Sequence, residues 1–210
     1  KKLEEMFSDV SLSKDLTREF NVNAEHNLNF GVTVCRHGSW PSKEYTPKAV
    51  PKALKVMTQK FEKFYKKEHA DRVLQWRMDQ GRATVLVKFK KQGIRLSVSS
   101  YQMAVLLVFN DTMTVSFQHI LNITGLRSDA NLQNHILSLE RSNVLQRKAA
   151  KGKRSFRKIE TTDMFRLNPR FTSKLKMITI PIWNIVRDDD EATRIDERVL
   201  QQRYRLADVA

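Results

Sequence analysis

The residue types that most often carry metal or nucleophilic chemistry are few in this 210-residue chain, and they are not spaced for such chemistry. The candidates are His26, His37, His69, His119 and His135, with the single cysteine Cys35. No histidine forms a zinc-ligand pair with the cysteine, and the sequence has no HExxH motif. Glycine-rich phosphate loops and a GxSxG nucleophile elbow are also absent from it. We therefore expect a protein that is not an enzyme and uses no cofactor and no metal ion.

A run of carboxylates and the single cysteine could in principle do chemistry, but structural roles explain both better. Asp188–Glu191 places four carboxylates in a row, and such a run before a helix more often caps the helix and opposes its dipole than binds a cation. Cys35 alternates with Val32 and Val34 and is interpreted as a strand residue. A lone cysteine favours a reducing compartment, so the cytoplasm and nucleus are the expected locations.

The charge is strongly basic and unevenly distributed. Lysine and arginine number 38 against 23 acidic residues, and the formal net charge is +15. The stretch Arg147–Lys158 holds seven basic residues and no acidic one. Such an excess attracts polyanions, but it does not choose between nucleic acid, anionic lipid and an acidic protein. No apolar run approaches the roughly 20 residues that span a bilayer, so no membrane role is expected.

The first half of the chain has the pattern of helices packed on a small sheet. Apolar residues recur at helical spacing from Leu3 to Phe20, and again between Pro51 and His69, where lysines fill the opposite face. Alternating apolar residues predict strands, which are Leu28–Cys35, Leu74–Met78, Ala83–Phe89 and Ile94–Ser99. The last three predict an antiparallel meander with a helix on one face.

The second half has the order helix, helix, helix, strand, loop, strand, which is that of a winged-helix domain. Ser99 or Ser100, Ser116 and Asp129 are expected to cap the three helices, and Gly125 to end the second. The predicted elements are helices over Tyr101–Asn110, Phe117–Ile123 and the stretch after Asp129, and strands Val144–Leu145 and Met164–Leu167. A further strand over Lys176–Trp183 and a charged helix from about Glu191 are expected to follow.

A basic wing makes nucleic acid a serious alternative partner. The third helix of the winged-helix domain would then be the recognition helix, and its polar candidates are Asn131, Gln133, Asn134 and Arg141. These residues equally fit a solvated helix face. The residues alone leave nucleic-acid binding and protein interaction both open.

Along nearly its whole length the chain resembles the cullin family. Six segments carry the resemblance in order: MFSDVSLSKDLTREF at Met6–Phe20, GSWP at Gly38–Pro41, the stretch Phe64–Trp76, YQMAVLLVFN at Tyr101–Asn110, the stretch Leu132–Leu145, and FTSKL at Phe171–Leu175. One departure is His69-Ala70-Asp71-Arg72, where the family has HSGR and so a glycine at a turn. That loss indicates a divergent member.

The resemblance implies an α+β fold that begins with the end of a helical bundle. The implied parts are residues 1–20 as the bundle end, 21–99 as an α/β subdomain with a small antiparallel sheet and a helix, 100–183 as a winged-helix domain, and 184–210 as a linker and helix leading to a second winged helix. The family's neddylation lysine lies in a segment expected to start near Ala210, so no residue here corresponds to it. We therefore expect the chain to be part of a longer protein.

The function implied by the resemblance is that of a non-catalytic scaffold in a cullin-RING ubiquitin ligase. A RING-box protein would add a strand to the α/β sheet, with interface candidates Val32, Val34, Trp40, Trp76, Val85 and Val87. A basic surface would attract a ubiquitin-conjugating enzyme, with candidates Lys60, Lys63, Lys66, Lys67 and Arg72. Adaptor and substrate receptor would bind outside this chain. The alternative is a winged-helix nucleic-acid-binding protein, although the cullin resemblance does not imply specific nucleic-acid binding.

Overall fold

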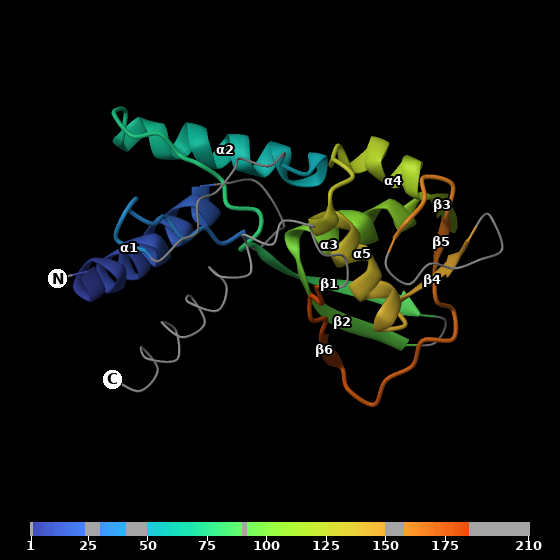
Figure 1. Cartoon of the computed structure of the whole chain (residues 1–210). Coiled ribbons are helices and arrows are strands. Elements are labelled where there is room, and N and C mark those ends of the chain that lie inside the picture. Colours follow the sequence, from blue (N-terminus) through green and yellow to red (C-terminus); the bar gives the residue numbers. More distant parts are fainter. Residues whose placement is uncertain (1, 24–29, 41–49, 90–91, 150–157, 185–210) are drawn as a thin grey trace.

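Two long helices lie beside a mixed α+β body (Figure 1). The computed structural model describes residues 2–23, 30–40, 50–89, 92–149 and 158–184. Helix α1 spans Lys2–Asn23 and helix α2 spans Lys52–Glu68, with Pro51 at the N-cap of α2. Both helices were expected from the helical spacing of their apolar residues, and both are confirmed.

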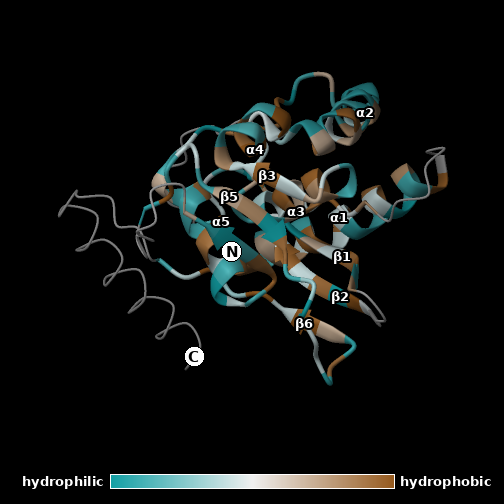
Figure 2. Ribbon diagram, turned by 90° about the vertical axis from the view of Figure 1, so that its right-hand side faces the viewer, coloured by the Kyte–Doolittle hydropathy of each residue, from teal (hydrophilic) through white to brown (hydrophobic). Residues whose placement is uncertain are grey.

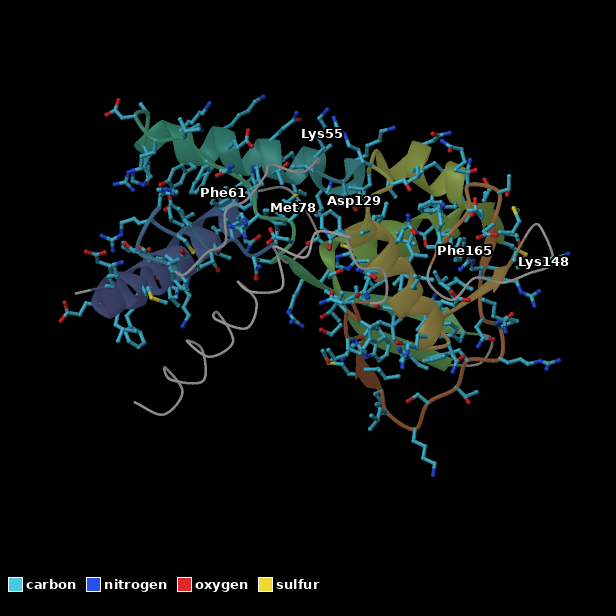
Figure 3. All side chains as sticks on the ribbon, viewed as in Figure 1. Lys55, Phe61, Met78, Asp129, Lys148 and Phe165 are labelled. Atoms are coloured by element: carbon cyan, nitrogen blue, oxygen red, sulfur yellow. The ribbon has the colours of Figure 1, made fainter. Side chains whose placement is uncertain are left out.

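An aromatic cluster joins the two helices. Its buried members come from the end of α1 and one face of α2, and they are Phe20, Met57, Phe61 and Tyr65. Phe61 is central, because its ring lies 5.3 Å from that of Phe20 and 5.9 Å from that of Trp76, centroid to centroid. Figure 3 marks Phe61 between α1 and α2. We call this group, with the half-buried Phe30, Val32, Val34, Phe64, Leu74 and Trp76 that pack on it, the aromatic cluster.

A three-stranded sheet forms the base of the rest of the fold. Strands β1, Arg82–Phe89, and β2, Gln92–Ser99, pair antiparallel, and β6, Met177–Thr179, pairs with β2 in parallel. The strand order is therefore β1-β2-β6, with β1 and β6 at the edges. The inner face of the sheet is apolar and buried, with Val87, Phe89, Ile94, Leu96 and Val98.

The other elements make up the winged-helix arrangement. They are helices α3, Ser100–Leu107, α4, Phe117–Thr124, and α5, Ala130–Arg141, with a sheet of order β3-β5-β4 whose first strand lies between α3 and α4 in the chain. Its strands are β3, Thr114–Ser116, β4, Leu145–Lys148, and β5, Met164–Leu167, and a short 3₁₀ helix, Val108–Asn110, follows α3. Strand β3 was not expected from the sequence, because three residues are too few to show an alternating pattern.

The helix caps are as expected from the sequence. Ser99 forms a capping box with Gln102, and Ser116 and Asp129 accept hydrogen bonds from backbone amides in the first turns of α4 and α5. Gly125 ends α4 with a φ of 70°, a left-handed conformation that favours glycine. These local signals place the helix ends correctly.

Two predicted strands are wrong. The described part of Leu28–Cys35 and the whole of Leu74–Met78 pair with no strand among the residues that the structure describes, so the predicted three-stranded meander is only the β1–β2 hairpin. The third strand of that sheet is β6, and the strand predicted over Lys176–Trp183 is only three residues long. Alternation reports which face of a segment is buried, but it does not report whether a neighbouring strand is present. The tip of the wing and the charged helix from Glu191 lie outside the described residues.

One continuous core joins the β1-β2-β6 sheet to the winged-helix elements. Its largest fully buried side chains come from both, among them Ile94, Leu96, Phe117, Ile136 and Phe165. The domain boundaries suggested by the sequence stay predictions, although packing is continuous across residues 99 and 100. No helix within the described ranges is long and apolar enough to cross a membrane.

A buried ion pair fixes the base of the wing. Arg147 on β4 donates to Asp163 Oδ2, and the two side chains are 1% and 2% exposed. The backbone amide of Glu160 also donates to Asp163 Oδ2, over 2.8 Å. Arg147 was counted with the basic wing, but the structure uses it inside the fold.

We expect Arg147→Met to lower the free energy of unfolding by about 3–5 kcal/mol, because it leaves the Asp163 carboxylate buried without its cation. Urea denaturation measures the loss. The matched control is Arg166→Met on the neighbouring strand β5, where the side chain is exposed, and its effect should stay below about 1 kcal/mol. Equal losses in the two variants would contradict this role for the pair.

Candidate partner-binding site

An extended segment, residues 30–36, lies against α1 and is held by side chains of that helix. Four residues of α1 bond the backbone of alternate residues of the segment. Asn21 Nδ2 donates to Phe30 O at 3.1 Å, and Asp9 Oδ2 accepts from Arg36 N at 3.0 Å. Between them, the Thr17 hydroxyl contacts Val32 O at 3.0 Å and Val32 N at 3.1 Å. The Ser13 hydroxyl contacts Val34 N at 2.8 Å and Val34 O at 3.3 Å. We call these four side chains the α1 ladder.

The spacing of the α1 ladder explains why it reaches only alternate residues. Four residues along an α-helix advance about 6.0 Å, and two residues along a strand advance about 6.6 Å. A helix residue every fourth position therefore stays level with a strand residue every second position. Segment 30–36 runs antiparallel to α1, since Asp9 meets Arg36 and Asn21 meets Phe30.

The other edge of segment 30–36 has no partner among the described residues. In an extended chain, successive residues direct their backbone N–H and C=O groups to opposite sides. The groups of Gly31, Thr33 and Cys35 therefore point away from α1. Within the described residues they make no hydrogen bond except a weak 4.0 Å contact from Cys35 Sγ to Thr33 O. A Cβ built on Gly31 would meet no atom within 4 Å, so the face of the segment on the Gly31 side is open as well.

A second extended segment, residues 72–77, lies on the same aromatic cluster. The side chains of Leu74 and Trp76 pack on the cluster, and the rings of Trp76 and Phe30 are 6.4 Å apart. Among the described residues, no hydrogen bond reaches the backbone groups of residues 73–76. Val73 is 93% exposed. Two extended segments thus pack on the same aromatic cluster, and each has backbone groups that no described residue pairs.

The structure brings some of the predicted interface residues together and separates others. Val32, Val34 and Trp76 lie on the aromatic cluster. Trp40 lies at the end of the α1 ladder, where its Nε1 donates to Asp9 Oδ2 at 2.9 Å. Val87 is buried in the inner face of β1.

The two β1 candidates therefore belong to the main core. Val85 packs half-buried against that core, and Val87 is 8% exposed, so neither valine projects outward from the sheet. The outward residue between them is Leu86, which is 60% exposed and was not singled out from the sequence. Strand alternation could have identified it, since residues at odd and even positions face opposite sides.

The α1 ladder is the functional feature that the sequence reasoning missed. Its residues Asp9, Ser13, Thr17 and Asn21 recur every fourth position, so they form one polar stripe on the helix. That stripe lies next to apolar residues which were used to predict the helix. A polar stripe on the inward side of a helix can indicate that the helix binds another segment, but the sequence alone does not show which segment that is.

We call each side chain of the α1 ladder, with the residue that it bonds, a rung. The buried carboxylate of Asp9 forms the last rung, with Arg36. Burial raises its pKa, but the hydrogen bonds from Arg36 N, Trp40 Nε1 and Arg36 Nε outweigh burial and hold the pKa below its ordinary value. Burial and the nearby Asp9 charge raise the pKa of the Cys35 thiol, which keeps the sulfur protonated and a weak nucleophile.

The predicted basic surface lies on α2 and just beyond it. Lys60, Lys63, Lys66 and Lys67 are exposed, and so is Arg72, whose Nη1 lies 3.3 Å from Tyr65 Oη. Figure 2 shows hydrophilic residues along the outer side of α2. Basic residues in the last turn of a helix also complement its dipole. This surface can attract an acidic partner.

Helix α5 does not have the exposure of a DNA recognition helix. Eight of its residues are buried, including the polar Asn134, and Gln133 Oε1 accepts from the backbone amide of Ile159 at 3.2 Å. Arg141 is exposed, but its guanidinium lies over the ring of Trp183, 5.0 Å from the centroid. A helix packed on most of its sides cannot enter a major groove.

The described part of the chain contains no group of three or more histidine, cysteine, aspartate or glutamate residues arranged to hold a metal ion.

We expect Asp9→Asn to lower the free energy of unfolding by about 2 kcal/mol at neutral pH, because it weakens charge-assisted bonds to Arg36. The folded-state pKa of Asp9 is lowered, so its contribution is fully present above the ordinary value of 3.8 and is lost as the pH falls through the folded value. Urea titrations at several pH values should show the difference from wild type shrinking below pH 3.8.

The control for this titration is Asp15→Asn. Asp15 is exposed and pairs only at the surface with Arg18, so its effect should be within about 0.5 kcal/mol. A difference between wild type and Asp9→Asn that does not change with pH would refute the assigned role of the Asp9 charge.

The comparisons with known proteins identify the family of the chain. A family model for the cullin alpha+beta domain matches residues 34–171. The chain is 34% identical to human Cullin-4A over 219 aligned residues, which cover 100% of the chain and 28% of that protein. It is 32% identical to Cullin-1 of Dictyostelium discoideum, and the match covers 96% of the chain and 27% of that protein. It is 31% identical to Cullin-2 of Arabidopsis thaliana, and the match covers 100% of the chain and 28% of that protein. The chain therefore spans little more than a quarter of these relatives, and over that span it belongs to the cullin family.

Proposed function

We propose that this chain is part of the non-catalytic scaffold subunit of a cullin-RING ubiquitin ligase, and that it binds a RING-box protein. Family membership supports the scaffold role. The observation that carries the binding proposal is a pair of extended stretches on one aromatic cluster: one edge of segment 30–36 and the backbone of residues 73–76 have no hydrogen-bond partner among the described residues. The residues that carry the open edge of segment 30–36, Gly31, Thr33 and Cys35, are exposed, so an incoming strand can reach their backbone groups.

Binding would proceed by strand addition. A strand of the RING-box protein would pair with the free backbone groups of Gly31, Thr33 and Cys35, and its alternate side chains would meet the aromatic cluster. The added strand would then contact Val32, Val34 and Trp76, which lie on that cluster. Trp40 would act at the end of the segment, through its bond to Asp9.

The scaffold needs no acid, base or nucleophile of its own. By holding a RING-bound conjugating enzyme near a substrate, it replaces a bimolecular encounter with a high effective concentration. The continuous core from the β1-β2-β6 sheet to the winged-helix elements supports this proposal, because a rigid body preserves the distance between its ends. Adaptor and substrate receptor would bind elsewhere in the longer cullin.

The basic face of α2 would raise the encounter rate of the conjugating enzyme. Charges at the edge of an interface change association rates more than final affinities. Lys60, Lys63, Lys66 and Lys67 are exposed, so they remain available to an acidic tail. The nucleic-acid alternative is disfavoured, since α5 is buried and Arg147 is used inside the fold.

We expect Thr33→Pro to weaken binding of a RING-box protein by about tenfold or more, because proline removes the free N–H and blocks the strand edge. The α1 ladder bonds the backbone of Phe30, Val32, Val34 and Arg36 but not that of Thr33, so this change spares it. Calorimetric titration measures the affinity, and Thr33→Ala, which keeps the N–H, should bind like wild type. Unchanged binding by Thr33→Pro would rule out pairing at this edge.

We expect the charge reversals Lys63→Glu, Lys66→Glu and Lys67→Glu together to slow association of an acidic-tailed ubiquitin-conjugating enzyme about tenfold at low salt. Stopped-flow measurements over a salt series should show the difference shrinking as salt rises. The control reverses three exposed lysines near the sheet, Lys88, Lys174 and Lys176. If both triple variants slow association equally, net charge alone is responsible and the α2 surface has no special role.

A further inference from the structure

We propose that the α1 ladder, Asp9, Ser13, Thr17 and Asn21, takes the place of a neighbouring strand and holds segment 30–36 ready for its partner. The ladder residues are positioning residues, because they act on the binding edge without lying on it. This inference rests on the proposed function and adds to it a reason why the site exists before the partner arrives.

An isolated extended segment does not order itself in water. Strands gain stability from neighbours that pair their backbone groups, and a lone strand has none. Ordering a segment only when the partner binds would subtract the ordering cost from the affinity. Segment 30–36 has no strand neighbour within the described residues, yet it is extended along α1. The helix side chains supply the missing pairs.

The central rung imitates a strand most closely. The Thr17 hydroxyl donates to Val32 O at 3.0 Å and accepts from Val32 N at 3.1 Å, so one side chain satisfies both backbone groups of one residue. In an antiparallel sheet, a directly opposite residue makes the same two bonds. The Ser13 hydroxyl accepts from Val34 N at 2.8 Å, while its own proton is directed to Asp9 O at 2.6 Å, nearer than Val34 O at 3.3 Å.

The rung at the far end adds charge. Asp9 receives the backbone amide of Arg36 at 3.0 Å and its Nε at 2.7 Å, and Arg36 Nη2 donates to Glu5 O at 3.0 Å. Ser39 Oγ donates to Glu5 Oε2 at 2.6 Å. These bonds tie the end of segment 30–36 to the first turns of α1, and charge-assisted bonds of this kind are the stronger ones.

The ladder also selects one register. A slip of one residue would direct Gly31, Thr33 and Cys35 towards α1 and would turn Phe30, Val32 and Val34 away from the aromatic cluster. The rungs and the apolar contacts therefore favour the same arrangement. The free edge is thus fixed in position and register, and the partner meets a preformed surface.

The test removes two hydroxyls from the 210-residue chain. The variant is Ser13→Ala with Thr17→Val, which keeps side-chain shape at residue 17. The matched control is Ser8→Ala with Ser11→Ala, two exposed serines of the same helix. A second comparison is Thr17→Val against Thr17→Ser, because serine keeps the hydroxyl. If the double variant fails to fold, this single pair answers the question.

Two measurements are made on each protein. The first is the dissociation constant for a RING-box protein that retains its N-terminal strand, which should rise about tenfold or more in the double variant and stay unchanged in the control. The second is hydrogen exchange at the amides of Val32 and Val34 without partner, which should become about tenfold faster or more in the double variant. Thr17→Ser should stay close to wild type in both.

The outcomes separate the two proposals. A double variant that exchanges faster at Val32 and Val34 yet binds as tightly as wild type overturns the inference, because order before binding would then be irrelevant. Equal exchange in all variants also overturns it. If the wild-type chain binds no RING-box protein, the proposed function fails, and the exchange measurement still decides whether the α1 ladder orders the segment.

Discussion

Backbone hydrogen bonding is the constraint on which the rest of this structure depends. Every extended segment carries donors and acceptors on two edges, and burial makes an unpaired edge costly. In segment 30–36 the α1 ladder satisfies one edge, and the other is open within the described residues. The result is a half-completed sheet element supported by helices. Under the proposed function, this open edge receives a strand of another chain.

The two apolar clusters have different roles. The main core, from Phe89 on β1 to Phe165 on β5, is a continuous packed body in which buried polar groups such as Asp163 are matched. Packing of this kind is rigid and resists volume change. The aromatic cluster is smaller, and most of its members are only partly buried. A rigid body with a less covered cluster at one side suits a scaffold that has to hold a partner at a fixed distance.

The helices and their ends were predictable because their signals are local. Ser99, Ser116 and Asp129 cap helices through bonds to residues three positions away, and Gly125 ends one through its own φ. The strands were less predictable, since Leu74–Met78 shows strand alternation but has no strand neighbour. The candidate site was predictable only in part, for the same reason.

The parallel pairing of β6 with β2 has a consequence for biosynthesis. The β1–β2 hairpin joins neighbours in the sequence, so it can form as soon as both strands leave the ribosome. The outer edge of β2 stays open until Met177–Thr179 arrives, after the whole winged-helix region has been made. During translation that edge is a site for mispairing. Chaperone binding over this interval would protect the open edge from mispairing.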